Sequence, residues 1–184
     1  MHFRGNSAGL VLALVSIPAL VAYAEDPAAG AVQQAGMAVG KAKAELPRLT
    51  KGGAAAQTAA DAARDAWNKS IPPVVAARRQ LEIATERAKS GKEEDIKKLE
   101  EAKNKLERVE KTQSRLFARS LAAQKEADAF VAAIAKTKTG VETAIGAAQT
   151  AINGMKNQEN HQKAFQAQLD MIKADWSKTE WAKK

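Results

Sequence analysis

The feature that most constrains this chain is a seam of apolar and small side chains spaced alternately three and four residues apart. The seam starts at Leu99 and keeps this spacing without error to Met155. Side chains at that spacing form one stripe on an α-helix and pack into the gaps of a facing helix, as in coiled coils. The spacing therefore predicts a long helix packed lengthwise against another. The seam consists of Leu99, Ala102, Leu106, Val109, Gln113, Leu116, Ser120, Ala123, Ala127, Phe130 and Ile134, with a weaker continuation through Thr137, Val141, Ala144, Ala148, Ala151 and Met155.

A shorter seam precedes this one, and the two do not share a register. The shorter seam runs through Val74, Ala77, Leu81, Ala84 and Ala88. Joining it to the longer seam requires two successive steps of four after Ala84. Either a continuous helix contains a stutter, or a turn lies at residues 90–92. We favour the turn, because Ser90 and Glu93 fit a capping box and acidic residues follow in the first helical turn.

Composition predicts an all-α fold. Alanine supplies 41 of the 184 residues and only eight residues are aromatic; alanine has the highest helix propensity, whereas β-branched and aromatic residues favour strands. A helix over residues 93–136 would be about 66 Å long. We therefore expect an elongated antiparallel helical bundle with coiled-coil-like packing. Glutamate precedes lysine by four residues in the stabilising pairs Glu93–Lys97, Glu94–Lys98, Glu101–Lys105 and Glu107–Lys111.

Glycine and proline suggest how the chain is divided. Residues 28–46 form a weak helical pattern interrupted by three glycines, and Pro47 and Gly52-Gly53 follow. A helix over residues 54–69 is expected to stop at Ile71-Pro72-Pro73. Further breaks are expected at residues 137–140, 153–154 and 157–160. The last helix, about residues 161–181, carries an apolar stripe of Phe165, Leu169, Ile172 and Trp176. We expect one elongated domain over residues 25–184, with a weakly ordered segment at 25–53 and the bundle at 54–184.

The first 24 residues have the pattern of a signal peptide. Arg4 precedes an apolar run over residues 8–21 that is too short to span a bilayer comfortably, and the small residues Ala22 and Ala24 flank Tyr23. We predict cleavage after Ala24 and secretion; the alternative is an uncleaved N-terminal anchor. Because Arg4 is the only charged residue in this segment, cleavage lowers the net charge from +8 to +7. A nucleic-acid partner is not expected outside the cell.

The residue inventory argues against catalysis. The chain has no cysteine, and His161 is the only histidine after residue 24. Nucleophilic-cysteine and haem-thiolate sites are therefore excluded, and the usual zinc and di-iron sites need more histidines or cysteines than the mature chain supplies. Gly52-Gly53 lacks the sequence of a phosphate-binding loop. We expect no enzyme, no cofactor and no metal.

A few residues deserve separate interpretation. Asn68-Lys69-Ser70 matches the N-glycosylation sequon, so Asn68 is a candidate glycan site. Gln113, Ser120 and Thr137 interrupt the apolar side chains of the long seam. They pair with other polar groups, lie on a part of the seam that faces solvent, or line a ligand pocket. The tryptophans at positions 67, 176 and 181 are interpreted mainly as packing anchors, with Trp181 the most exposed.

The signal peptide, the alanine-rich amphipathic helices and the stretch EEDIKKLEEAKNKLERVEK at residues 93–111 together resemble the alanine-rich and glutamate/alanine-rich surface proteins of trypanosomes. The resemblance covers residues 25–184 in composition and helical layout. It implies an elongated helical bundle that coats a cell. The chain ends in Lys183-Lys184 rather than in the apolar tail of a glycolipid-anchor signal, so we expect either a soluble mature protein or an incomplete chain.

Three classes of function remain after these exclusions. The leading hypothesis is a secreted or cell-surface helical bundle that acts as a coat or interaction protein with a macromolecular partner. The second is a small-ligand carrier with a pocket between helices near Gln113 and Ser120. The third is a peripheral membrane binder that uses basic residues near the C-terminus such as Lys173 and Lys178.

Overall fold

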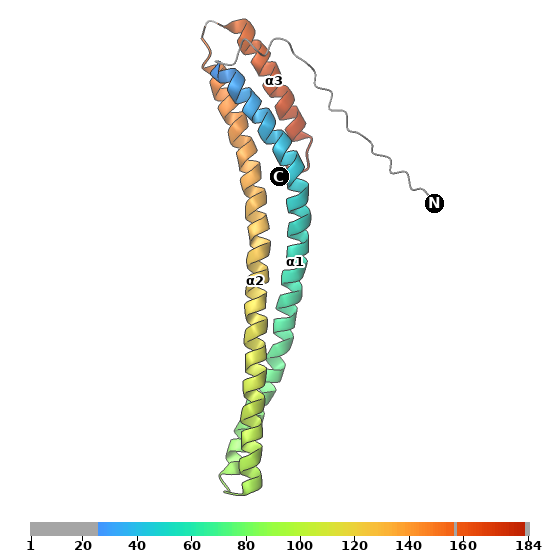
Figure 1. The fold of residues 1–184 in the computed structure, drawn as a ribbon, viewed down its shortest axis with the longest axis vertical. Helices are drawn as coiled ribbons and strands as arrows, with labels where there is room; N and C mark the ends of the chain where they lie inside the picture. The colour runs from blue at the N-terminus through green and yellow to red at the C-terminus, as the bar shows by residue number, and fades with distance from the viewer. Residues whose placement is uncertain (1–25, 157, 183–184) are drawn as a thin grey trace, which may run out of the picture.

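The structure is a computed structural model that describes residues 26–156 and 158–182, and this part of the chain folds into three α-helices with no strand. They are α1 (Pro27–Ala88), α2 (Glu93–Asn153) and α3 (Glu159–Ser177). α1 and α2 form a long hairpin, and α3 lies against its open end (Figure 1). The predicted all-α antiparallel bundle is confirmed. The predicted signal peptide and the cleavage site after Ala24 lie outside the described residues.

The long seam of α2 packs as the spacing predicts. Each of its residues from Leu99 to Met155 is buried or half-buried, whereas most of their neighbours are exposed. The helix continues through the break expected at residues 137–140, and it ends at the break expected at 153–154. At 61 residues, α2 is about 92 Å long, so the molecule is a rod.

α1 carries a matching seam over its whole length, which extends far beyond the predicted stretch at residues 74–88. Steps of three and four alternate without error, and no residue of this seam is exposed. The hairpin is therefore one uninterrupted pair of facing seams. The seam of α1 consists of Ala28, Val32, Ala35, Val39, Ala42, Leu46, Leu49, Gly53, Ala56, Ala60, Ala63, Trp67, Ser70, Val74, Ala77, Leu81, Ala84 and Ala88.

The breaks expected in this region are wrong, because Pro47, Pro72 and Pro73 all lie inside α1. All three prolines are exposed and off the seam. A proline removes one backbone hydrogen bond from the helix, but on the solvent side the freed carbonyl can bond water. The seam keeps its register across each proline, so packing against α2 holds the helix together. Residues 27–53 consequently form the first part of α1 rather than a separate segment.

A tight turn joins α1 to α2, which confirms the turn that the register break predicts at residues 90–92. Gly91 adopts a positive φ of 72° there. The predicted capping box is wrong: the N-cap of α2 is Lys92, with no side-chain cap, and Ser90 Oγ instead donates to Asp95 Oδ2 at 3.0 Å. Acidic residues do occupy the first turn of α2, and the Lys98–Glu94 pair next to it closes at 2.5 Å.

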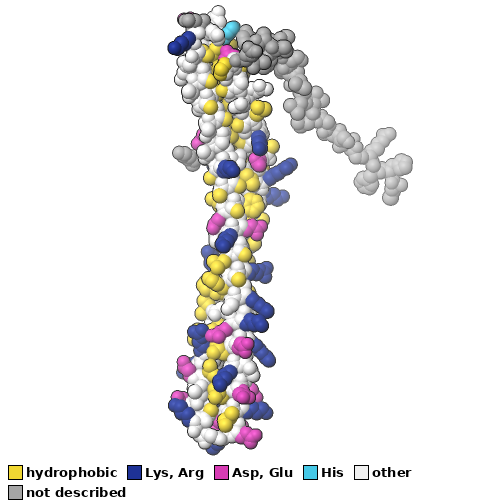
Figure 2. Space-filling model, turned by 60° about the vertical axis from the view of Figure 1, so that its left-hand side comes forward, with side chains coloured by type: hydrophobic (Ala, Val, Ile, Leu, Met, Phe, Trp, Pro, Cys, Tyr) yellow, Lys and Arg dark blue, Asp and Glu magenta, His cyan; other side chains and the backbone are white. Residues whose placement is uncertain are grey.

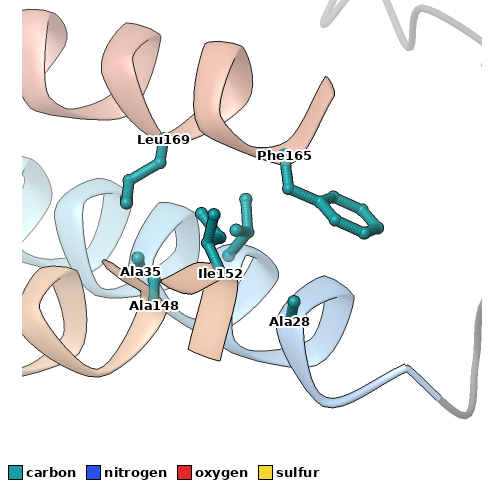
Figure 3. Close-up of a cluster of buried hydrophobic side chains, with 7 residues drawn as sticks. Ala28, Ala35, Ala148, Ile152, Phe165 and Leu169 are labelled. Atoms are coloured by element: carbon teal, nitrogen blue, oxygen red, sulfur yellow. The ribbon is translucent and has the colours of Figure 1, made fainter. Parts of the chain in front are cut away.

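The deepest part of the core lies at the open end, where three helices meet. Leu169 of α3 points toward Ala148 and Ile152 of α2 and Ala35 of α1 (Figure 3). Leu46, Val141 and Trp176 form an adjoining cluster. Toward the turn only two helices remain, and α2 has no fully buried residue over 93–126. The lower hairpin therefore leaves more of its apolar surface open to solvent.

Two glycines should respond in opposite ways to replacement by alanine. Gly91→Ala forces a side chain into left-handed backbone and should cost about 1–2 kcal/mol of unfolding free energy. Gly146 lies inside α2 with open space where a Cβ would stand, so Gly146→Ala should add up to about 1 kcal/mol. Urea unfolding followed by circular dichroism measures both. If both substitutions changed the free energy of unfolding in the same direction, the conformation assigned to the turn would be contradicted.

A candidate interaction surface along one edge of the hairpin

Two rows of side chains border one edge of the hairpin. Each row consists of the residues that directly follow every second seam residue, so its members recur every seven positions. Arg78 and Glu110, one from each row, are joined by a hydrogen bond of 2.8 Å across the edge. We call this the α3 edge, because α3 lies on its upper part. The rows are Gly36, Lys43, Thr50, Gln57, Arg64, Ile71 and Arg78 on α1, and Ile152, Ile145, Lys138, Val131, Gln124, Phe117 and Glu110 on α2.

α3 covers the α3 edge from the open end down to Thr50. A Cβ built at Gly36 would lie 3.6 Å from Cδ1 of Ile172. Lys43 Nζ pairs with Asp175 Oδ1 at 2.8 Å. Trp181 Nε1, just beyond α3, donates to Thr50 Oγ1 at 3.4 Å. The three contacted residues of α1 are seven positions apart, which is about two helical turns. α3 and the residues just after it therefore run along the α1 row.

The apolar stripe predicted for α3 is the face that docks. Phe165, Leu169 and Trp176 are buried and Ile172 is half-buried. Trp181, expected to be the most exposed tryptophan, is half-buried against the cluster around Trp176, as is Trp67 within the seam, whereas Trp176 is buried. The upper part of the α3 edge is thus a docking site for one amphipathic helix, α3.

Polar contacts complete this seat on the α2 side. Gln149 Nε2 donates to Gln166 Oε1 at 2.7 Å, and Lys173 Nζ donates to Gln149 Oε1 at 2.6 Å. Lys173 is also 3.8 Å from Asp170. This lysine, considered above as part of a basic membrane-binding end, is instead engaged between α3 and α2.

Below Thr50 the α3 edge is uncovered and unusually apolar. Six of the nine large hydrophobic side chains that are exposed lie along it, between 37% and 65% accessible. Three stand in the two rows, Ile96 continues the α2 row toward the turn, and Val75 and Leu121 lie beside the rows, directly after the seam residues Val74 and Ser120. Trp67 on the adjoining seam packs against Phe117 in a tilted arrangement, with ring centroids 5.2 Å apart and the ring planes at 48°. The central four of them, Ile71, Val75, Phe117 and Leu121, lie at one level of the hairpin, and an exposed apolar patch of this kind is a candidate interaction site. The six residues are Ile71, Val75, Ile96, Phe117, Leu121 and Val131, and the other three are Met37, Ile83 and Met171.

The opposite edge of the hairpin is basic. Over residues 64–87 and 98–126 it carries Lys69, Arg87, Lys98, Lys105, Arg108, Arg115 and Arg119 against only Glu101 and Glu126. On the α3 edge the same stretch carries Arg64, Arg78 and Lys103 against Glu82, Glu100, Glu107 and Glu110. In Figure 2 hydrophobic side chains gather along one side of the middle of the rod, and Lys and Arg side chains project mainly from the other. The two edges therefore suit different partners.

Asn68, the predicted glycan site, borders the uncovered α3 edge. It is exposed on α1 three residues before Ile71. Ser70 of the same sequon is half-buried, and its Oγ donates to the Trp67 carbonyl at 2.5 Å. Glycosylation stays a prediction. A glycan on Asn68 would stand over the apolar patch.

The remaining candidate residues are spread along the rod. His161 is exposed at the start of α3, and among residues 26–156 and 158–182 no three histidine or carboxylate side chains converge to hold a metal ion. Gln113, Ser120 and Thr137 are half-buried in the seam. Thr137 lines an open groove of about 460 Å³ with Lys41 and Glu45. None of the described helices is long and apolar enough to cross a membrane.

Comparison of the chain with known protein families, with curated proteins and with solved structures gives no match. The α3 edge is therefore assigned from the geometry and chemistry of the described residues alone.

The docking of α3 on this edge can be tested by two substitutions on the same helix. Leu169 is fully buried and Met171 is 67% exposed. Leu169→Ala should lower the free energy of unfolding by about 2–5 kcal/mol, whereas Met171→Ala should change it by no more than about 0.5 kcal/mol. Chemical denaturation measures both variants. Similar losses, or none, would mean that α3 does not dock as described.

Proposed function

We propose that the mature chain, residues 25–184, is a secreted, non-enzymatic interaction protein that binds a helix of another protein molecule along the uncovered α3 edge. The observation that carries this proposal is the concentration of exposed apolar side chains there, at Ile71, Val75, Phe117 and Leu121 among others. Burying such side chains is the main source of favourable free energy in protein association.

The upper part of the same edge supports a helix as the occupant. α3 already docks there through side chains spaced four, three and four residues apart, at Phe165, Leu169, Ile172 and Trp176. An amphipathic helix that lays its apolar face into a groove is a common mode of protein recognition. The uncovered part repeats the same seven-residue rows, so it offers a further helix the same geometry.

The shape and the predicted compartment fit this role. A rod of about 92 Å carries a long, narrow binding surface rather than an enclosed pocket. The signal-peptide pattern over residues 1–24 supports export. The resemblance to helical surface proteins supports a place at or near a cell surface.

Site-specific photo-crosslinking tests the binding surface directly. A photoreactive benzoylphenylalanine replaces Leu121 on the α3 edge, or Ile83 outside that edge as the control, in the full chain made by its source cells. These positions are 48% and 47% exposed. We expect a covalent adduct of one discrete mass from position 121 and none from position 83. No adduct at 121, or the same adducts at both, would contradict the proposal.

Export has its own test. Mass spectrometry of the protein recovered outside the cytoplasm should find Glu25 as the N-terminal residue, because cleavage is predicted after Ala24. A protein recovered only with residues 1–24 still attached would contradict the predicted processing.

A further inference from the structure

We infer that the occupant of the uncovered α3 edge is a second copy of this chain, packed antiparallel to the first about a two-fold axis level with Ile71 and Phe117. The inference rests on the proposed function of this edge. In such a dimer α1 packs against α1 of the partner and α2 against α2, so the two hairpins form a four-helix bundle in which every neighbouring pair of helices is antiparallel.

The length of the uncovered edge fits this arrangement. The edge is free from Thr50, where Trp181 ends the covered part, to the turn at Gly91. That stretch is about 60 Å long, and Ile71 lies at its middle. With the two-fold axis there, the turn of each copy comes level with Thr50 of the other. Each copy therefore fills the free edge of its partner and stops where α3 begins.

Charges on α1 match across the same axis. In an antiparallel pair of identical helices, residues equally far above and below the axis face each other. Asp61 and Arg78 are equidistant from a point between residues 69 and 70, so Asp61 of each copy faces Arg78 of the other. About the same point Glu82 faces Gln57, so a carboxylate meets an amide that can donate to it.

Charges on α2 give an independent estimate of the axis. Asp128 and Lys103 are equidistant from a point between residues 115 and 116, and so are Glu107 and Gln124. This point lies level with residues 69 and 70 of α1, because Trp67 packs against Phe117 and Lys105 Nζ donates to Gln80 Oε1 at 2.9 Å. Both helices thus place the axis at one height, the height of the apolar patch.

The opposite edge cannot replace the α3 edge in this role. Seven basic side chains face only two acidic ones there, so two copies brought together on that edge would repel each other. The α3 edge combines near-balanced charge with the apolar residues Ile71, Val75, Phe117 and Leu121. Pairing on the α3 edge leaves the basic edges of both copies on the outside of the dimer.

Sedimentation equilibrium of the mature chain measures the association. We expect a dimer with no larger species. Ile71→Asp and Leu121→Asp replace exposed side chains. Ile71→Asp brings two carboxylates together beside the axis, and Leu121→Asp faces Glu110 of the other copy, so each should raise the dimer dissociation constant at least tenfold without loss of helix by circular dichroism. Ile83→Asp, at a position that is 47% exposed but off the α3 edge, should leave the constant unchanged. A monomeric wild-type chain, an open series of oligomers, or equal effects of all three variants would overturn the inference.

Disulfide trapping measures the orientation. The chain has no cysteine, so Asp61→Cys and Arg78→Cys each introduce one thiol. Mixing the two variants under mild oxidation should yield mainly the mixed 61–78 disulfide. Little mixed disulfide, or disulfides formed mainly between identical positions, would contradict the antiparallel register about residues 69 and 70 and overturn the inference.

The photo-crosslinking adduct separates this inference from the proposed function. An adduct at position 121 with twice the mass of the chain agrees with both. An adduct of another mass upholds the α3 edge as a binding surface but overturns the second copy as its occupant. The absence of any adduct overturns both.

Discussion

The packing of two continuous seams against each other is the interaction on which the rest of the structure depends. The seam of α1 is built largely from alanine and valine, and alanine is also the commonest residue in the seam of α2. Because these side chains are small, the hydrophobic contact between α1 and α2 is only one layer deep. Such a contact holds two long helices together but cannot cover their flanks. At the open end α3 covers one flank and creates the deepest core, around Leu46, Leu169 and Ile152. Toward the turn no helix covers the same flank, so the apolar residues on it are exposed.

How far the sequence predicts this structure depends on whether the signal is periodic or local. The spacing from Leu99 to Met155 identified the buried face of α2, and the register break identified the turn at residues 90–92. The same periodicity runs through α1 from Ala28 to Ala88, but the local rules for Pro47, Pro72 and Pro73 obscured it. Those rules describe an isolated helix. Here the prolines are on the solvent side, where the freed carbonyls can bond water and the seam is untouched.

The candidate interaction surface was beyond the reach of sequence reasoning for a different reason. Ile71, Phe117 and Leu121 belong to one surface only when the alignment of α1 with α2 is known, since they lie off the seam and far apart in the chain. The edge of the hairpin on which α3 docks is likewise known only from the tertiary structure, through contacts such as that of Lys43 with Asp175. The apolar residues at the positions next to the seam mark this surface, but they can be recognised as one surface only after the two seams have been aligned. The same geometry places the candidate glycan site Asn68 beside the apolar patch, so a glycan on Asn68 and a protein bound to the patch would exclude each other.

Small-angle X-ray scattering of the mature chain tests the central claim, that the α3 edge is a surface for antiparallel packing, most directly. From the levels of the two-fold axis and the helix ends, the account predicts a particle of twice the chain mass with a maximum dimension of about 130 Å. A single-copy rod of about 90 Å, or a particle of twice the mass that is no longer than one hairpin, would contradict it.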